Sequence, residues 1–473
     1  MHRLLLLLMS LSTSLVWGYK LDEASGNALD AVGSLDLTDN GSVGSTTGKI
    51  SNARVLDGSD DRFNRASNSA FQFGDIDWTI SGWFYPTSFS YSIRGTLVAK
   101  TDTISSAEYE IYVTTGAKVV VQFNGTVTSS NSATLNAWNF FVARYDSVNN
   151  TLNIYLNGTH TQATGMSFSP TDSTDFWIGG ETSSGSPYLL FIGNIDEVWG
   201  WKRLLSDDEC DDLYNDFNGL ANSDWAKPDT PAAELTTSLS GWWAQDEASG
   251  NALDSHTNSL TLTQTGTVGS TTGKVSNCRD YSSGNYFSRT DEALLSFADD
   301  DFCWAGWVNF DSLPGNVPVV SKWSGSVWEY ILYYHASSAR FEWQCNGASI
   351  RSNTFGAPST GTWYFVSVWH DKTVNLLHIS INTGKSDVVA LSGGTVDGTG
   401  TLFFGRNTFG DQLDGKMDEW GLWSRRLYPW ERRYLYNSGN GRAYADFAGA
   451  PPSKPSFTVN TLRPRIFAPG LAR

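Results

Sequence analysis

Carboxylates gather near both ends of each half of the chain. The set comprises Asp22, Glu23, Asp30 and Asp196 in the first half and Asp246, Glu247, Asp254 and Asp418 in the second. Calcium is held by several hard oxygen ligands offered from backbone turns. We expect the first and last strands of each half to pair as neighbours, which would bring these acids close together. The acids therefore predict a structural calcium site in each half. Alternatively, the same acids cap turns and pair with Arg54, Arg203, Arg279 or Arg425.

Aromatic residues found in one half only are the candidates for ligand contact. A sugar ring usually stacks on an exposed aromatic face beside a few polar groups. Features that both halves share are explained by a common scaffold, whereas features that differ can confer specificity. The candidates are Tyr91, Tyr188, Trp323, Trp328 and Trp343. Trp83 and Trp307 each follow a glycine in an apolar run, and we predict that both lie in the core.

Enzymatic catalysis would require a different pattern of residues from the two sets described above. Glycosidases use two carboxylates at a fixed separation. The nearest approaches are Asp75-Ile76-Asp77 and Glu108-Tyr109-Glu110, and the second half keeps only Glu329-Tyr330 of the latter. The six histidines show no paired metal spacing, and no nucleophile elbow or phosphate loop occurs. The sequence therefore predicts a recognition protein and not an enzyme.

Composition and charge narrow the class of protein further. Aromatic residues make up 14% of the chain, charged residues 17%, and glycines number 45, which is typical of a sheet protein. The formal net charge of −17 disfavours nucleic acid and anionic membranes as partners. No apolar run reaches the roughly 18 residues that a membrane-spanning helix needs. A disulfide between Cys278 and Cys303 is conceivable, but sequence alone does not decide it.

An internal repeat organises the whole chain. Asp22–Asp30 recurs letter for letter as Asp246–Asp254, and Gly193–Glu197 matches Gly415–Glu419. A chain of 473 residues exceeds one ordinary core, and so long a period indicates two complete domains. We predict domains at 11–220 and 235–448, a linker at 221–234 and a basic, proline-containing tail at 449–473.

The elements that position these residues are short strands and one helix per domain. Leu152, Ile154 and Leu156 alternate with polar residues, and turn clusters recur at about 8–12 residues, as in a sandwich or jelly roll. Ser206–Glu209 has a capping-box pattern that predicts a helix start. Pro429 stands at the matching helix entry of the second domain.

Both halves resemble laminin-G-like jelly-roll domains of the concanavalin A-like lectin/glucanase superfamily. The landmarks are Leu15–Asp30, Val55–Gly58, Ile154–Gly158 and Gly193–Glu197 followed by Trp201 and Arg203–Ser206. The second copy departs where Ser282 replaces Asp57 and where the hairpin reads Asn382-Thr383-Gly384. The resemblance implies an all-β chain of two tandem β-sandwich domains, often with calcium and often serving glycan or protein recognition. It fixes no ligand.

Two functions remain open. One is a carbohydrate-binding or adhesin module that recognises a glycan or a surface protein outside the cell, at the cell surface or on a virion. The other is a structural protein that docks into an assembly through its tail, 451–473, which has several arginines and no acid.

The start of the chain is equally open. Residues 1–11 resemble a secretory signal peptide, but Leu11–Leu15 matches Leu235–Leu239 in the repeat, so cleavage would fall within the first domain. The true start is either Met1 or Met9.

Overall fold

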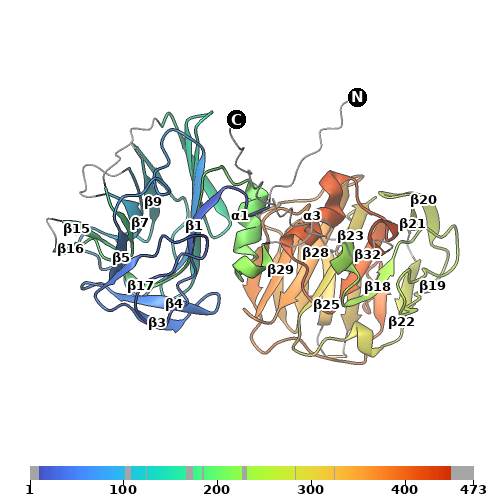
Figure 1. Ribbon diagram of the computed structural model, residues 1–473. Helices are drawn as coiled ribbons and strands as arrows, with labels where there is room; N and C mark the ends of the chain where they lie inside the picture. Colours follow the sequence, from blue (N-terminus) through green and yellow to red (C-terminus); the bar gives the residue numbers. More distant parts are fainter. Residues whose placement is uncertain are drawn as a thin grey trace, which may run out of the picture.

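The computed structural model describes residues 10–101, 108–123, 125–166, 174–183, 186–225, 232–282, 284–323, 325–326 and 328–448. These residues form two β-sandwich domains, which lie side by side (Figure 1). Each sandwich pairs an eight-stranded with a seven-stranded antiparallel sheet, counted over the described residues. The prediction of an all-β chain with two sandwich domains is confirmed.

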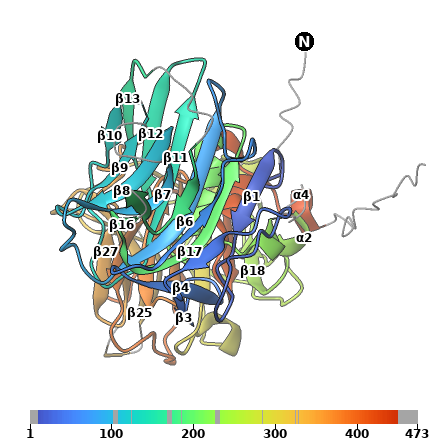
Figure 2. The same cartoon turned by 60° about the vertical axis from the view of Figure 1, so that its left-hand side comes forward.

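The first domain contains strands β1 to β17. Its eight-stranded sheet, whose strands are labelled in Figure 2, runs in the order β13 (Thr159–Thr164), β12 (Thr151–Leu156), β11 (Asn139–Asp146), β6 (Trp78–Pro86), β17 (Ile192–Trp201), β4 (Asn52–Asp57) and β3 (Gly44–Thr47), with β1 (Leu15–Tyr19) also paired to β17. The seven-stranded sheet runs β10 (Thr126–Thr128), β9 (Val119–Gln122), β8 (Tyr109–Thr114), β7 (Arg94–Lys100), β14 (Phe176–Ile178), β5 (Arg62–Arg65) and β2 (Thr38–Asn40). A separate hairpin joins β15 (Glu181–Ser183) to β16 (Ser186–Tyr188).

The second domain repeats this plan. Its eight-stranded sheet runs β20 (Gly269–Thr272), β21 (Asn277–Tyr281), β32 (Gly415–Trp423), β23 (Phe302–Phe310), β28 (Trp363–Asp371), β29 (Leu376–Ile381) and β30 (Asp387–Ala390), with β18 (Leu239–Trp243) paired to β32. The seven-stranded sheet runs β19 (Thr263–Thr265), β22 (Tyr286–Arg289), β31 (Leu402–Phe404), β24 (Val317–Trp323), β25 (Trp328–His335), β26 (Arg340–Cys345) and β27 (Ala348–Arg351).

Short helices follow the last strand of each domain. They are α1 (Asp207–Tyr214), η1 (Asn222–Asp224) and α2 (Ala232–Leu235), then α3 (Pro429–Tyr436), η3 (Asn437–Gly439) and α4 (Ala445–Ala448), while η2 (Ala293–Leu295) lies within the second domain. Ser206 and Glu209 form the predicted capping box of α1, and Pro429 opens α3. Within the predicted linker, Trp225 is buried and its ring centroid lies 4.6 Å from that of Trp199.

A hydrophobic core fills the space between the two sheets of each domain. Smaller clusters lie on the other face of each eight-stranded sheet, beneath the helices. Trp83 and Trp307, which we predicted to be core residues, are each 2% exposed and belong to these smaller clusters. The eight-stranded sheets are therefore covered on both faces. The four cysteines are all buried and free, so Cys278 and Cys303 are not bridged.

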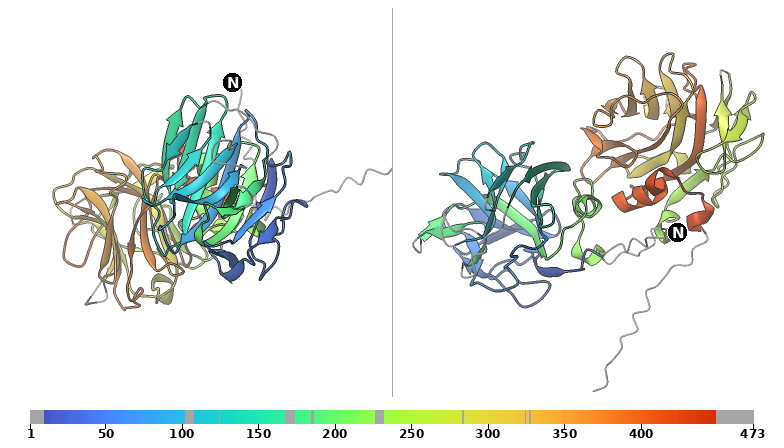
Figure 3. Two further views of the ribbon diagram at one scale, coloured as in Figure 1. Left: turned by 90° about the vertical axis from the view of Figure 1, so that its left-hand side faces the viewer. Right: turned by 90° about the horizontal axis from the view of Figure 1, so that it is seen from above.

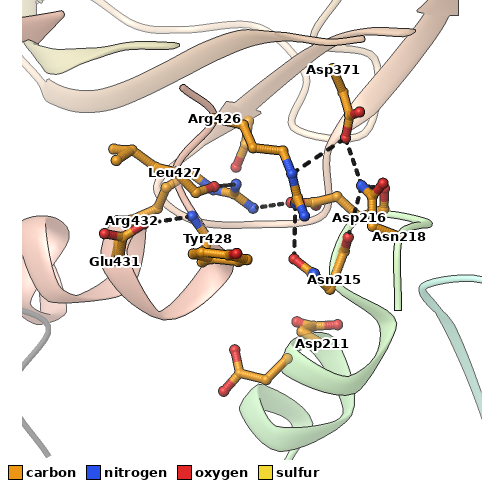
Figure 4. A network of polar contacts seen from close by, with 12 residues as sticks. Asp211, Asn215, Asp216, Asn218, Asp371, Arg426, Leu427, Tyr428, Glu431 and Arg432 are labelled. Carbon is orange, nitrogen blue, oxygen red and sulfur yellow. Dashed lines mark hydrogen bonds and ion pairs between the residues drawn. The ribbon is translucent and has the colours of Figure 1, made fainter. Parts of the chain in front are cut away.

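The two domains meet through α1 and α3, and the helices lie between the sandwiches (Figure 3). Arg432 donates to Asp216 at 2.8 Å, Asn218 to Asp371 at 2.6 Å and Arg426 to Asn215 at 3.0 Å (Figure 4). Arg432 and Asp216 are both buried. The interface is thus a packed, charge-paired contact.

Candidate ligand-binding site

Three aromatic side chains form an exposed cluster at one end of the seven-stranded sheet of the second domain. Trp323 ends β24, Trp328 begins β25, and Phe409 lies in the loop between β31 and β32. The Trp323 ring centroid lies 4.8 Å from that of Trp328 and 5.3 Å from that of Phe409, and Trp328 and Phe409 are 5.6 Å apart. Phe409 is 67% exposed, and both tryptophans are half-buried. We call Trp323, Trp328 and Phe409 the aromatic platform.

A buried ion pair holds the hairpin that carries the two tryptophans. Lys322 Nζ pairs with Glu329 just below the platform and also lies 2.8 Å from a carboxylate oxygen of Asp291. It donates further to Ser296 Oγ at 2.8 Å and to the carbonyl of Gly398 at 3.1 Å. Because Lys322 is fully buried, these partners fix the ends of β24 and β25 and so the spacing of the tryptophans.

Asn407 shapes the loop that presents Phe409. Its Oδ1 accepts from the main-chain N–H of Phe409 and of Asp411, both at 3.0 Å. Its Nδ2 donates to Asp411 Oδ2 at 2.8 Å. Asparagine side chains commonly stabilise a turn by accepting a hydrogen bond from the backbone two residues later. The exposed ring of Phe409 is therefore held in place against the tryptophans.

The first domain has the same hairpin base without these aromatics. Lys100 Nζ lies 3.0 Å from Glu108 Oε2, which matches Lys322 and Glu329. At the position of Trp323 stands Thr101, which is buried. Since the scaffold is shared and the aromatics are not, packing of the fold does not require the aromatic platform.

The structure separates the five predicted ligand-contact aromatics. Trp323 and Trp328 come together in the platform, and Tyr188 is half-buried on β16, opposite Glu181. Tyr91 is 8% exposed and Trp343 is 0% exposed, and both pack in the domain cores. A buried ring offers no face to a sugar, so the prediction for these two residues was wrong.

Phe409 was missed because only Trp and Tyr were weighed as platform residues. Its place in Asn407-Thr408-Phe409-Gly410, a run of turn-forming residues around one large apolar side chain, was the available signal.

Four of the eight predicted metal ligands accept main-chain hydrogen bonds within turns. Asp30 accepts main-chain N–H groups of Gly18, Val32 and Leu35 at 3.0–3.1 Å, and Asp254 matches it in the second domain. Glu23 accepts from Leu29 N at 3.0 Å, and Glu247 from Leu253 N at 2.7 Å. For these residues the structure agrees with turn capping, the alternative that the sequence left open.

The remaining four acids lie beside two glutamates, Glu197 and Glu419. Asp196 Oδ2 accepts from Lys49 N at 2.7 Å and Ile50 N at 2.9 Å, whereas its Oδ1 is buried without a partner. Burial raises the pKa of Asp196 to about 9, and the charge of Glu197 adds to the shift. Burial likewise raises the pKa of Glu197 to about 8, with the charge of Asp22 contributing.

The second domain repeats this arrangement. Burial raises the pKa of Asp418 to about 8 and that of Glu419 to about 9, and Asp246 adds to both shifts. Asp418 Oδ1 and Glu419 Oε1 are both buried without a partner. Orphaned, desolvated carboxylate oxygens in matching places suit a cation.

One tighter acidic group occurs elsewhere. Among the described residues, Asp57, Asp60 and Asp61 alone bring three ligand atoms within 4.8 Å of one another. Asp57 and Asp60 are exposed, and Asp57 Oδ1 already accepts from Ser59 N at 2.7 Å. A cation bound at Asp196 would therefore need main-chain oxygens as well as carboxylates.

A carboxylate pair lies between the seven-stranded sheet of the first domain and the β15–β16 hairpin. Arg94 binds Glu110 through two hydrogen bonds of 2.6 and 2.5 Å, and Thr96 Oγ1 lies 3.2 Å from Glu110 and 3.1 Å from Glu181. Burial, then the charge of Glu110, raises the pKa of Glu181 to about 8. Both carboxylates are buried, so they are engaged with the protein and turned away from solvent.

A family model described as the concanavalin A-like lectin/glucanases superfamily matches residues 57–210 and 282–431. No curated protein matches the chain. Among solved structures, the binding domain of Paraclostridial mosquitocidal protein 1 is 13% identical, with 87% of this chain and 98% of that chain covered and a TM-score of 0.38. Domain 4 of a GH43 extracellular arabinanase from Geobacillus stearothermophilus, in complex with arabinotriose, is 17% identical, with 44% and 98% covered and a TM-score of 0.33.

A third similar structure is the CBM40 of Ruminococcus gnavus IT-sialidase bound to alpha2,3 sialyllactose. It is 19% identical, with 28% of this chain and 80% of that chain covered and a TM-score of 0.26. In the described part of this chain, no helix has the length and apolar character needed to cross a membrane.

Proposed function

The chain belongs to the concanavalin A-like lectin/glucanase superfamily, and we propose that it is a recognition protein whose second domain binds carbohydrate on the aromatic platform. The observation that carries this proposal is the exposed, mutually packed cluster of Trp323, Trp328 and Phe409. Its presence in only one of two otherwise matching domains argues for a role in binding.

The chemistry of the platform suits a pyranose ring. Aromatic faces pack against the C–H groups of a sugar, and polar groups at the edge pair with its hydroxyls. Thr408 and Asp411 are exposed beside Phe409 and supply such an edge. A carbohydrate ligand would place the protein outside the cell, at a cell surface or on a virion.

Binding should depend on the platform residues one by one. We expect Trp323→Ala and Phe409→Ala each to weaken glycan binding about tenfold or more, since stacking on one aromatic side chain is worth about 1–3 kcal/mol. The measurement is a broad glycan array, followed by titration calorimetry with the best glycan. Phe355→Ala, which removes another partly exposed phenylalanine from the second domain, is the matched control and should bind normally. A blank array with folded protein, or full binding by the platform variants, would overturn the proposal.

The proposed role is non-catalytic. The carboxylate pair of the first domain supports this, because Glu110 is bound by Arg94 and Glu181 is buried beside it. Release of reducing sugar from the glycans that bind would contradict it.

We further propose that each domain binds structural calcium. Asp196 and Glu197, together with main-chain oxygens, would hold it in the first domain, and Asp418 and Glu419 in the second, with Asp22 and Asp246 adding negative charge nearby. The support is the pair of matching sites with orphaned buried oxygens and raised pKa values. The cation would supply the positive charge that these desolvated carboxylates lack.

Terbium luminescence tests the calcium proposal, because a tryptophan touches each site. Trp199 Nε1 donates to Glu197 at 2.8 Å, and Trp242 Nε1 to Glu419 at 2.5 Å. We expect tryptophan-sensitised terbium emission that falls when calcium displaces the bound terbium. Asp196→Asn and Asp418→Asn should each remove about half of this emission, because the two proposed sites are alike. Asp57→Asn is the control. Emission that is absent, or that disappears only in Asp57→Asn, would exclude these sites.

A further inference from the structure

Arg406 differs from every other arginine in the described part of the chain. Its guanidinium has no hydrogen bond and no ion pair, and its Nε is buried without a partner. The other described arginines bind carboxylates or main-chain carbonyls, as Arg351 binds Glu342 at 2.6 Å. The protein carries a net charge of −17, so acidic partners for an arginine are abundant. Because Arg406 has no acidic partner among the described residues, its guanidinium is available to bind a ligand.

The backbone of Arg406 is connected to the segments that carry the aromatic platform. It lies three residues before Phe409 in the loop that Asn407 holds. Its carbonyl accepts from Ser321 Oγ at 2.8 Å, and Ser321 stands two residues before Trp323 on β24. The backbone of Arg406 is thus tied to β24 by one hydrogen bond and to Phe409 by a short stretch of loop.

The guanidinium is held in a defined orientation. Its central carbon lies 4.6 Å from the ring centroid of Tyr286, whose ring meets that of Phe403 edge-on at 5.7 Å. Phe403 lies opposite Ser321 on the neighbouring strand. Stacking on an aromatic face leaves the edge of a guanidinium free to donate, and that edge fits a carboxylate or sulfate group with two parallel bonds.

The repeat shows that the scaffold does not need this arginine. Gly405-Arg406 in the second domain matches Gly179-Gly180 in the first, where Gly405 and Gly179 make equivalent main-chain bonds to Val319 and Leu97. Arg406 therefore occurs in the one domain that also carries the aromatic platform.

We propose that the carbohydrate bound by the platform is acidic, and that Arg406 binds its carboxylate or sulfate group. This inference rests on the proposed function. It assigns the ligand class, an oligosaccharide with at least one anionic sugar, and it makes Arg406 the residue that selects against neutral glycans.

The test compares neutral and anionic sugars of matched length on the full chain. The probes are galactose trisaccharide, galacturonic acid trisaccharide, lactose and 3′-sulfated lactose, titrated by calorimetry at low and high salt. We expect at least one anionic probe to bind about tenfold or more tightly than its neutral match, as a charge-assisted pair would give, and to weaken in high salt. Arg406→Gln should abolish the preference, and Arg406→Lys should restore part of it.

Matched variants separate the possible failures. Arg340→Gln removes the same charge from the start of β26 in the same domain, where the arginine binds only carbonyls, and should keep the preference. Equal binding of neutral and anionic probes that Trp323→Ala still abolishes would overturn the role of Arg406 and leave the platform proposal standing. Loss of the preference in Arg340→Gln as well would reduce it to a general charge effect. Binding of no probe, together with a blank glycan array, would remove both proposals.

Discussion

At the scale of single residues, burial decides which carboxylates are charged. Arg94 binds Glu110 with both arms of its guanidinium. Glu181 lies against the same group without a cation of its own, and burial together with the charge of Glu110 raises its pKa to about 8. At neutral pH Glu181 is therefore mainly protonated.

This arrangement predicts how the stability of the folded protein changes with pH. The pKa of Glu181 is higher in the folded than in the unfolded chain, where it is about 4.5. The folded state therefore binds more protons, and this contribution to stability falls as pH rises from about 4.5 to about 8. Glu181→Gln should remove that fall and stabilise the protein by about 1–2 kcal/mol at pH 8, because one pKa unit corresponds to about 1.4 kcal/mol.

Urea denaturation between pH 5 and pH 8 measures how the free energy of unfolding changes with pH. Glu292→Gln, which changes a more exposed glutamate, is the control. A pH profile for Glu181→Gln parallel to that of the wild type would show that Glu181 does not titrate as described.

Residue type predicted only part of the candidate site. Trp328 and Trp343 are both tryptophans on neighbouring strands of the second domain, yet Trp343 faces the core opposite Leu332 and Trp328 reaches the surface. Which face a strand residue takes depends on strand register, and one step reverses every side chain. The sequence showed the alternation but not the register, so it could name candidates without separating them.

At the scale of elements, one buried ion pair supports the platform hairpin. Lys322 and Glu329 are fully desolvated, so neither tolerates the loss of the other. We expect Lys322→Met alone to cost about 3–5 kcal/mol and to weaken glycan binding, whereas Lys322→Met with Glu329→Leu recovers most of the stability. Urea denaturation of the full chain measures both.

Lys100→Met is the matched control in the first domain. It breaks the equivalent pair with Glu108 and should destabilise the protein without affecting glycan binding. A double variant as unstable as Lys322→Met alone would show that the pair does not act as a unit.

Elements defined by local sequence were predicted well, and elements that depend on distant contacts were not. The capping box at Ser206 and the helix entry at Pro429 follow from residues a few positions apart, and both are confirmed. The return of the loop around Asn407 onto the hairpin of Trp323 depends on contacts some eighty residues apart. No local pattern encodes such a contact.

At the scale of the whole molecule, the duplicated helices meet with opposite charge. α1 carries Asp207, Asp208, Asp211 and Asp212, whereas Cys210 and Asp211 correspond to Arg432 and Arg433 on α3. Arg433 pairs with Asp212 and lies 3.5 Å from Asp208. The repeat predicted two domains but not how the domains pack against each other. The difference in charge between the two copies of the helix was the sequence feature that could have predicted this packing.

The docking predicts that one interface charge matters to overall shape. Asp216→Asn leaves the buried guanidinium of Arg432 without its carboxylate, and removing one partner of a buried pair costs about 3–5 kcal/mol. We expect the two domains to move apart, with a larger radius of gyration in small-angle X-ray scattering and separate melting transitions.

Asp414→Asn, which changes an acid away from the interface, is the control. Scattering of Asp216→Asn identical to that of the wild type would show that the pair does not hold the domains together.

The predicted tail, 451–473, and residues 1–9 lie outside the described residues, so docking into an assembly through the tail stays a prediction. It becomes the leading alternative if no glycan binds.

The most direct test of the central claim is a crystal structure of the full chain with the glycan that binds most tightly on the array. We predict a sugar ring stacked on Phe409 and Trp323, with its neighbouring hydroxyls facing the loop of Asn407. A glycan seated elsewhere would contradict the account. The cavity of about 350 Å³ between the domains, lined by Tyr214, Lys385 and Arg432 among others, is the place where we would then expect to find it.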